Sequence, residues 1–268
     1  MITIKIPKEA IAITSTSSKG DQSKWCIGNK WVKQNTRGYE NLAEVLASLI
    51  LECSTLNPST YVSYSPCLIE LSNGDIKHGC YSLDFRGTKQ EVTLERLFEA
   101  NFSSTDEIIN NATLSTEEKF ERLTKKIQEY TGLNVSTELA RVLAFDALIL
   151  NEDRHTNNIL FLYDPIQKSW ELAPIFDHGL SFLSDIKDYP LGKPLTILMR
   201  NVKAKPLNSS FSKQLALYKG EPFIRKDELI RKVEDSPIKL DRAKEVLFSQ
   251  LQDPKFQHLF REGSENND

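Results

Sequence analysis

Apolar and polar residues alternate along the first third of the chain, which is the pattern of half-buried β-strands. Gly28-Asn29 separates two alternating runs at the spacing of a hairpin turn, and residues 72–75 separate a second pair. The runs lie at residues 2–6, 11–13, 24–27, 30–33, 61–64, 67–71 and 78–82. We therefore expect a mostly antiparallel sheet in which residues 1–14 form edge strands.

Between the two predicted hairpins the apolar period changes to that of a helix. A single stripe spaced by three and four residues consists of Leu42, Val45, Leu46, Leu49, Ile50 and Cys53. Asn57-Pro58 ends this segment, because a residue that precedes proline disfavours helical backbone. Residues 1–84 are thus predicted to form a small lobe of strands with one helix.

Beyond residue 84 the pattern is typical of helices. The segment 139–150 is apolar on nearly all sides, so we expect it to be the buried centre of a larger lobe, with Ser136 or Thr137 as its N-cap. The predicted helical segments are residues 94–98, 120–130, 139–150, 210–218, 227–233 and 241–251. The predicted fold class is α+β, with residues 85–268 as the mainly helical second lobe.

A polar cluster, NEDRHTNN at residues 151–158, follows directly on the predicted buried helix. Residues 159–162 then resemble a strand that returns to the core, and a later extended stretch ends just before Asp177. This return would bring Asp177 beside Asp153 and Asn158. Two carboxylates and one amide oxygen would then meet.

Such a set of side chains suits phosphoryl transfer. One aspartate orients the proton of an attacking hydroxyl, while an amide oxygen and a second aspartate hold the Mg²⁺ that bridges nucleotide phosphates. Protein kinases space the catalytic Asp and the metal-binding Asn five residues apart, as Asp153 and Asn158 are here. The sequence Asp177-His178-Gly179 keeps the Asp and Gly of the later metal-binding motif, although Arg154-His155 follows Asp153 where eukaryotic kinases place His-Arg before it.

These motifs resemble the HipA-like serine/threonine kinases, and among them a compact CtkA-like branch. The resemblance is carried by residues 151–158, by APIFDHG at residues 173–179 and by GYENLAE at residues 38–44, and a weaker similarity runs from about Ser15 to about Phe211. Phosphatidylinositol kinases are similar more distantly. The resemblance implies a bilobal protein-kinase-like fold that binds ATP and Mg²⁺ between its lobes, with Asn158 and Asp177 as the metal ligands.

The small lobe also supplies candidates for ATP binding. Lys33 is the predicted phosphate-positioning lysine, with Lys30 and Lys24 as competitors, and Glu44 is its expected partner, with Glu40 in reserve. A small-residue loop before the first hairpin would cover the ATP phosphates with backbone N–H groups. Its candidate residues are Ser15, Ser17, Ser18, Lys19 and Gly20.

Two further residues belong to the predicted site. Tyr81 lies where a kinase hinge would offer backbone groups to adenine. His155 stands within the predicted catalytic loop beside Asp153, and we expect it to brace the loop by hydrogen bonds, because Asp153 already takes the place of the base.

Composition and charge argue against several other classes of function. The chain has 268 residues, a hydrophobic content of 40% and a formal net charge of −3, which argues against broad docking on nucleic acid or an anionic membrane. No apolar run approaches a membrane span and no secretory signal is evident, so we expect a cytoplasmic protein, with secretion as an effector left open. The four cysteines form no CxxC pair, and we expect structural thiols.

The expected activity is ATP- and Mg²⁺-dependent transfer of the γ-phosphate to a serine or threonine of a protein. The resemblance also implies autophosphorylation of the loop that contains Ser15, Ser17 and Ser18, and a role as a toxin or effector with an antitoxin or other regulatory partner. Two alternatives stay open. One is a lipid or small-molecule kinase, and the other is an ATP-binding pseudokinase that acts as an interaction module.

Overall fold

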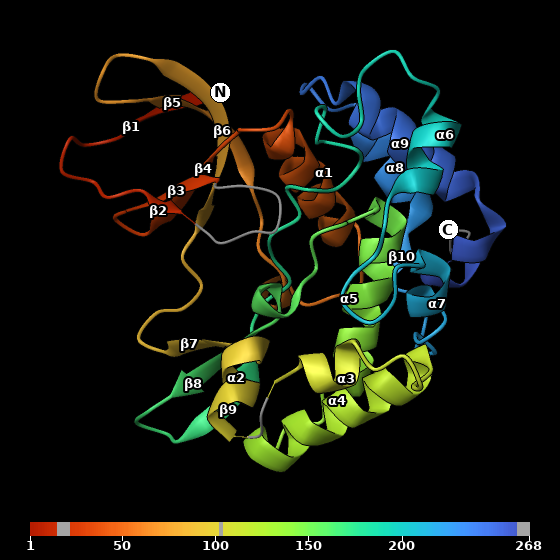
Figure 1. The fold of residues 1–268 in the computed structure, drawn as a ribbon. Helices are drawn as coiled ribbons and strands as arrows, with labels where there is room; N and C mark the ends of the chain where they lie inside the picture. Colours follow the sequence, from red (N-terminus) through yellow and green to blue (C-terminus); the bar gives the residue numbers. More distant parts are fainter. Residues whose placement is uncertain (15–21, 102–103, 262–268) are drawn as a thin grey trace, which may run out of the picture. The chain divides into compact units, whose positions relative to one another are not determined.

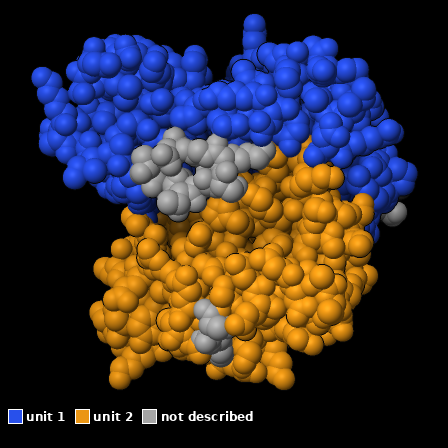
Figure 2. Space-filling model, viewed as in Figure 1, with its two compact units in different colours: residues 1–84, 177–201, 221–268 blue, residues 85–176, 202–220 orange. Residues whose placement is uncertain are grey.

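The structure is a computed structural model that describes residues 1–14, 22–101 and 104–261 (Figure 1). The chain divides into two compact units, coloured separately in Figure 2. Unit 1 comprises Met1–Asp84, Asp177–Asn201 and Glu221–Asp268, and unit 2 comprises Phe85–Phe176 and Val202–Gly220. The chain passes from unit 2 back to unit 1 at the peptide bond between Phe176 and Asp177.

A six-stranded sheet in the order β1-β5-β6-β4-β3-β2 forms the first part of unit 1. Among the described strands of this sheet, only β1 and β5 pair in parallel, and residues 2–5 and 13–14 do form its two edges, as predicted. Both predicted hairpins are confirmed, and Gly28 turns the first with a φ of 62°. The strands are β1 (Ile2–Lys5), β2 (Ile13–Thr14), β3 (Ser23–Ile27), β4 (Lys30–Gln34), β5 (Ser65–Glu70) and β6 (Ile76–Leu83).

Period two gives the sheet one apolar face. Cys67 and Ile69 lie two residues apart on β5, Trp25 pairs with Val32 across β3 and β4, and these four residues form a buried cluster with Ile6. Helix α1 contacts β5 and β6, and it also contacts α8 and α9, so it lies between the sheet and these helices (Figure 1). Its predicted apolar stripe is therefore buried at Val45, Leu46, Ile50 and Cys53 and half-buried at Leu42 and Leu49.

The remaining elements of unit 1 come from distant parts of the sequence. The C-terminal helices join the N-terminal sheet because α8 and α9 pack against α1. The elements are α1 (Glu40–Glu52), η1 (Pro58–Thr60), α6 (Leu195–Asn201), β10 (Ile224–Arg225), α8 (Lys226–Glu234), α9 (Asp241–Gln252), η3 (Pro254–Leu259) and β11 (Phe260–Arg261).

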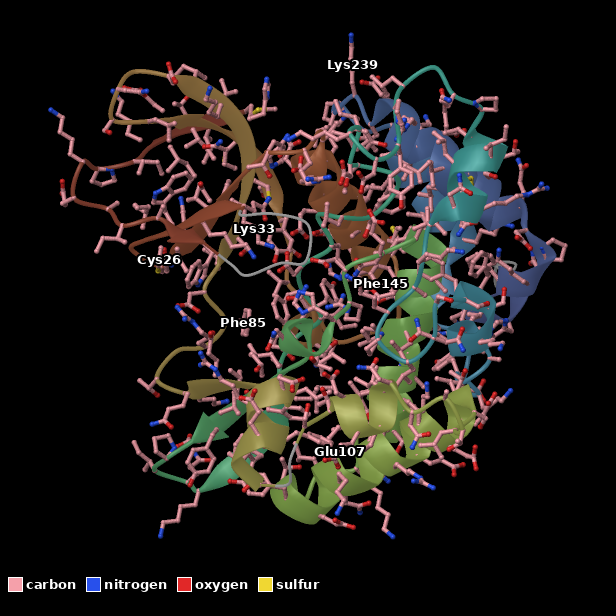
Figure 3. All side chains as sticks on the ribbon, in the orientation of Figure 1. Cys26, Lys33, Phe85, Glu107, Phe145 and Lys239 are labelled. Atoms are coloured by element: carbon pink, nitrogen blue, oxygen red, sulfur yellow. The ribbon has the colours of Figure 1, made fainter. Side chains whose placement is uncertain are left out.

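Unit 2 combines helices with a three-stranded antiparallel sheet in the order β7-β8-β9. Helix α5 is buried along most of its length, as its sequence predicts, and its residue Phe145, labelled in Figure 3, is fully buried. Ser115 and Glu118 form a capping box at the start of α4. The elements are β7 (Gln90–Thr93), α2 (Leu94–Asn101), α3 (Asp106–Ile109), α4 (Thr116–Thr131), α5 (Ser136–Ile149), η2 (Thr156–Asn158), β8 (Leu160–Asp164), β9 (Ser169–Leu172) and α7 (Phe211–Leu215).

Three local predictions were wrong. Residues 61–64 form no strand, because the backbone N–H of Tyr64 donates to the Ser48 hydroxyl of α1 (2.8 Å), so their alternation reflects packing on a helix. Strand β7 lies in the region predicted to be helical. Helix α5 has Val135 as its N-cap and no side-chain cap, so neither Ser136 nor Thr137 serves there.

The two units do not coincide with the predicted lobes throughout. Residues 1–84 all fall in unit 1, but residues 177–201 and 221–268, which the sequence placed in the helical lobe, join them. The division into kinase lobes at residue 84 therefore remains a prediction. None of the helices in the described ranges is long and apolar enough to cross a bilayer.

Candidate active site

Lys33 on β4 is the centre of a charge cluster in unit 1. Its neighbour Val32 faces the apolar cluster, so Lys33 faces the opposite side of the sheet, where only 5% of it is exposed (Figure 3). Its Nζ donates to Oε1 of Glu44 (2.6 Å), to Oδ1 of Asp177 (2.8 Å) and to the hydroxyl of Tyr64 (3.2 Å). The lysine is therefore held from three directions.

Glu44, and not Glu40, is the partner of Lys33. Glu44 is fully buried on α1, and its second oxygen accepts a hydrogen bond from the backbone N–H of His178 (2.9 Å). Glu40 instead accepts from the backbone N–H groups of Arg37 and Gly38 at the start of α1. The two glutamates that the sequence left as alternatives thus have different contacts.

Asp177 occupies a left-handed backbone conformation with a φ of 61°, which aspartate tolerates better than most residues. Its Oδ1 accepts from Lys33, and its Oδ2 accepts from Lys24 (3.1 Å). Its backbone N–H donates to the Tyr64 hydroxyl (3.4 Å). Such a conformation persists where its surroundings hold it, and here they include a backbone hydrogen bond and two lysines.

The charges of this cluster support one another. Burial disfavours the ionised Asp177, but Lys24 and Lys33 outweigh it and hold the pKa of this carboxyl well below its usual range. Burial likewise opposes the Glu44 carboxylate, whose pKa is nonetheless lowered by Lys33 and His178. Burial also disfavours the charged form of Lys33, but Asp177 and Glu44 outweigh it and raise the pKa of this ammonium group. Two ammonium groups and two carboxylates therefore form one largely buried charge cluster.

A second set of predicted residues lies in unit 2, where α5 leads into residues 151–158. The Arg154 guanidinium forms a buried pair with Asp146 of α5, with Nε 2.8 Å from Oδ2 and Nη2 3.1 Å from Oδ1. Its Nη1 donates to the backbone carbonyls of Asn158 and Phe176, each at 2.9 Å. Asn151 donates to Asp146 (2.8 Å) and accepts from the backbone N–H of Asp153 (3.1 Å). These contacts fix the backbone on both sides of Asp153.

The Asp153 carboxylate lies between two basic side chains. Its Oδ1 is 3.3 Å from Nζ of Lys205, and its Oδ2 is 3.7 Å from Nε2 of His155. The side-chain amide of Asn158 donates to the Asp153 carbonyl (2.8 Å). Since this bond uses the amide nitrogen, and no residue in the described ranges donates to Oδ1 of Asn158, that oxygen is the part of the side chain left for a cation.

The residues present fit a nucleotide-bound Mg²⁺. Within the described ranges, no three His, Cys, Asp or Glu side chains are grouped to hold a metal ion by themselves. Mg²⁺ keeps several waters and binds through one or two protein oxygens plus substrate phosphates, so a large cluster is not required. Asp177 in unit 1 and Asn158 in unit 2 each offer an oxygen atom of the kind that Mg²⁺ prefers.

The other predicted site residues within the described ranges are not part of the two clusters above. Tyr81 on β6 packs against the apolar cluster of the sheet, and Nζ of Lys30 lies over its ring at 5.0 Å from the centroid. Lys30 is thus occupied away from Asp177, whereas Lys24 reaches it. Ser15, Ser17, Ser18, Lys19 and Gly20 lie outside the described residues.

Sequence reasoning missed three residues that the structure adds to these clusters, namely Tyr64, Asp146 and Lys205. Tyr64 was taken for part of a strand, and Asp146 is hidden within an apolar helix. Lys205 is 52 residues from its partner Asp153. An unpaired acid inside a buried helix, as Asp146 appears in the sequence, is a signal that could have been used, since a buried charge needs a partner.

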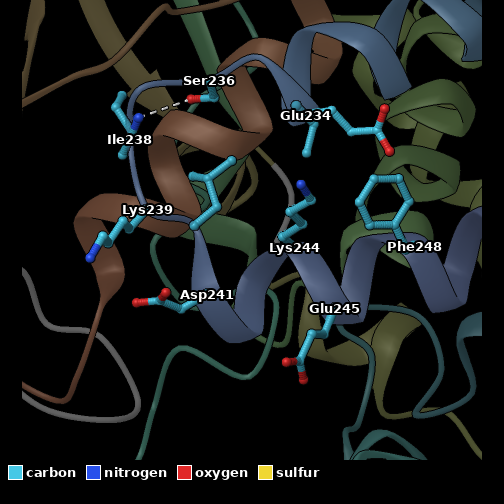
Figure 4. Close-up of a pocket in the computed structure, with 10 residues that line it drawn as sticks. Glu234, Ser236, Ile238, Lys239, Asp241, Lys244, Glu245 and Phe248 are labelled. Atoms are coloured by element: carbon cyan, nitrogen blue, oxygen red, sulfur yellow. Dashed lines mark hydrogen bonds between the residues drawn. The ribbon is translucent and has the colours of Figure 1, made fainter.

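A pocket of about 420 Å³ lies elsewhere in unit 1, where the chain enters α9 (Figure 4). Figure 4 shows acidic and basic side chains around its rim, and the backbone N–H of Ile238 donates to the Ser236 hydroxyl (3.3 Å). Its lining is Val233, Glu234, Ser236, Ile238, Lys239, Leu240, Asp241, Lys244, Glu245 and Phe248. None of the predicted site residues belongs to it.

Comparison with known structures defines the class of the fold as kinase-like. The solved structure of the proinflammatory kinase CtkA of Helicobacter pylori aligns with a TM-score of 0.59 over 93% of both chains, at 18% sequence identity. The predicted resemblance to the compact CtkA-like kinases is thereby confirmed in the fold, as is the predicted fold class. At this identity the likeness shows the fold alone.

Other comparisons add less. The complex of HipA, HipB and operator DNA from the toxin–antitoxin system of Shewanella oneidensis MR-1 aligns at 13% identity with a TM-score of 0.41, over 95% of this chain and 65% of that one. This score is too low to support a conclusion. No protein-family model matches the chain, and no curated protein sequence does.

Proposed function

We propose that the protein is an ATP- and Mg²⁺-dependent kinase that transfers the γ-phosphate to a serine or threonine hydroxyl of a protein. The observation that carries this proposal is the cluster of Lys33, Glu44 and Asp177 within a kinase-like fold. A lysine paired to a helix glutamate and set against a metal-binding aspartate is the arrangement that kinases use for the phosphates of ATP.

In this proposal Lys33 binds the α- and β-phosphates, and Glu44 and Tyr64 fix the position of its ammonium group. Asp177 and Asn158 would hold Mg²⁺, which would neutralise phosphate charge when it is bound. Backbone groups near Tyr81 would receive adenine, and the predicted loop with Ser15 to Gly20, which lies outside the described residues, would cover the phosphates. Asp177 must then exchange its lysine contacts for the metal ion, while the lysines turn to the phosphates.

Asp153 acts on the acceptor. Its carboxylate accepts a hydrogen bond from the attacking hydroxyl, whose oxygen forms the new bond to the γ-phosphorus as the bond to the bridging oxygen of ADP breaks. The hydroxyl proton passes to the carboxylate. Arg154 and Asn151 hold the backbone beside Asp153, and His155 braces the loop, so the contribution of the protein is mainly positioning and charge stabilisation.

The test is transfer of label from γ-labelled ATP in the presence of Mg²⁺, with Asp153→Asn and Asp177→Asn beside the wild type. We expect label on serine or threonine in the wild type, and a loss of about 100-fold or more in each variant. Wild-type protein that binds ATP but labels no protein would favour a lipid or small-molecule kinase or a pseudokinase. Absence of ATP binding would overturn the proposal.

Autophosphorylation belongs to the same proposal. Phosphate on Ser15, Ser17 or Ser18 would lie next to the phosphates of bound ATP and repel them, which would lower nucleotide affinity. Phosphorylation sites mapped by mass spectrometry after incubation with ATP check this directly. Modified residues found only outside this loop would end the idea, without affecting the proposed transfer to other proteins.

A further inference from the structure

Lys205 places an ammonium group at the candidate catalytic base. Its Nζ lies 3.3 Å from Oδ1 of Asp153, while His155 faces the other carboxylate oxygen. The Lys205 side chain is 34% exposed and that of Asp153 is 9% exposed. The lysine thus contacts a nearly buried carboxylate while about a third of its own side chain stays exposed.

The position of Lys205 is set by a buried framework. Its backbone carbonyl accepts a hydrogen bond from Nε2 of Gln214 (2.9 Å), and Oε1 of the same amide accepts from the backbone N–H of Leu207 (3.1 Å). Gln214 is fully buried on α7, which packs along α5, the helix that leads to Asp153. Lys205 and Asp153 are therefore fixed relative to each other through one pair of helices.

The pair with Lys205 compensates the charge of the nearly buried Asp153 carboxylate, but it does not shape the loop around that carboxylate. The backbone beside Asp153 is already held by Asn151 and by the buried pair of Arg154 with Asp146. Lys205 makes none of these backbone contacts. Its ammonium group instead keeps a positive charge beside the carboxylate that would accept the hydroxyl.

A positive charge at this position can stabilise the phosphoryl group during its transfer. An acceptor hydroxyl bonded to Asp153 lies about 2.7 Å from its carboxylate, and the phosphoryl group that it attacks lies next to it. Negative charge is spread over the three equatorial oxygens of this group during the transfer. A cation at Asp153 is then within reach of those oxygens.

We propose that Lys205 is a catalytic residue whose ammonium group contacts the transferring phosphoryl group. This inference rests on the proposed kinase function. The acceptor oxygen bonds to the γ-phosphorus, the bond to the bridging oxygen of ADP breaks, and the proton passes to Asp153. Lys205 stays protonated throughout and stabilises the charge of the phosphoryl oxygens more strongly in the transition state than in bound ATP.

The test compares Lys205→Met and Lys205→Arg with Lys203→Met. Lys203 is an exposed lysine two residues away, and the structure records no polar contact between its side chain and the residues described. We expect Lys205→Met to lower kcat about 100-fold with little change in KM for ATP, because one charge-stabilising group is lost. Lys205→Arg should keep more activity than Lys205→Met, and Lys203→Met should match the wild type.

Binding provides a second readout, independent of turnover. ADP with aluminium fluoride and Mg²⁺ mimics the transferring phosphoryl group, so Lys205→Met should bind this complex at least about tenfold more weakly, with its affinity for Mg²⁺-ADP unchanged. Wild-type kcat in Lys205→Met, or unchanged affinity for the aluminium fluoride complex, would overturn the inference. A wild type that transfers no phosphate would instead refute the kinase function on which the inference rests.

Discussion

At the scale of single residues, Tyr64 links the two ends of the charge cluster. Its hydroxyl contacts both Nζ of Lys33 and the backbone N–H of Asp177, and the Lys33 ammonium also lies 4.7 Å from the centroid of its ring. Burial, followed by the nearby Glu44 carboxylate, raises the pKa of this phenol, so it remains protonated at neutral pH. It therefore acts as a neutral support between charged groups.

We predict that Tyr64→Phe lowers the free energy of unfolding by about 1 to 2 kcal/mol, since a hydrogen bond to a charged group is lost in a buried place. Chemical denaturation measures this loss, and titration with ATP should show weaker binding. Tyr61→Phe is the matched control, because the structure records no hydrogen bond from its hydroxyl to the described residues. Equal stability of both variants would argue against the supporting role.

The cysteines allow a prediction about thiol reactivity at a given pH. Cys26, labelled in Figure 3, is exposed, whereas Cys53, Cys67 and Cys80 are buried. Burial raises the pKa of Cys53 and Cys67 to about 11. Thiolate is the reactive form, so a raised pKa lowers reactivity at neutral pH. At pH 8 we expect one fast thiol per native chain, which Cys26→Ser removes, and four after denaturation. More than one fast thiol in the native protein would contradict this burial.

At the scale of elements, the buried pair of Asp146 and Arg154 joins α5 to the loop that contains Asp153. Breaking a buried pair leaves a charge without its partner, so we predict that Asp146→Asn costs about 3 kcal/mol of stability and lowers phosphate transfer. The exposed pair of Lys126 and Glu129 on α4 is the control, and Glu129→Gln should leave stability close to that of the wild type. Thermal or chemical unfolding of both variants provides the comparison.

Another element contact involves the segment that follows Asp177. Phe182 and Leu183 are buried and both have a left-handed backbone, with φ of 53° and 60°. Arg242 of α9 donates to the carbonyls of Leu183 and Tyr189 and to the hydroxyl of Tyr39, which itself donates to the carbonyl of Phe182 or Leu183. This network compensates for the strained backbone.

We predict that Arg242→Met speeds amide hydrogen exchange in residues 181–190 by about tenfold, since charge-assisted hydrogen bonds contribute about 1.5 kcal/mol or more. Lys244→Met, on the same helix, is the control, because Lys244 lies over the ring of Phe248 instead. Mass spectrometry after exchange resolves this segment. Equal exchange in the two variants would show that Arg242 does not hold it.

At the scale of the whole molecule, sequence patterns predicted what depends on neighbouring residues. Hairpins, the helix at residues 40–52 and the buried α5 follow from local periodicity. Strand β7 was missed because its partner β8 lies about 70 residues later, and Lys205 was missed because only the packing of α7 on α5 brings it to Asp153. Motif spacing selected Lys33, Glu44 and Asp177 but left Lys24, Lys30 and Glu40 as alternatives, which only side-chain contacts distinguish.

The central claim is that Lys33, and not Lys30 three residues before it, serves phosphate transfer. The most direct test measures transfer of label from γ-labelled ATP by the wild type, Lys33→Met and Lys30→Met. We predict that Lys33→Met loses about 100-fold or more while Lys30→Met remains close to the wild type, since Lys33 contacts Glu44 and Asp177 whereas Lys30 lies over the Tyr81 ring. Full activity in Lys33→Met, or a loss confined to Lys30→Met, would contradict this account.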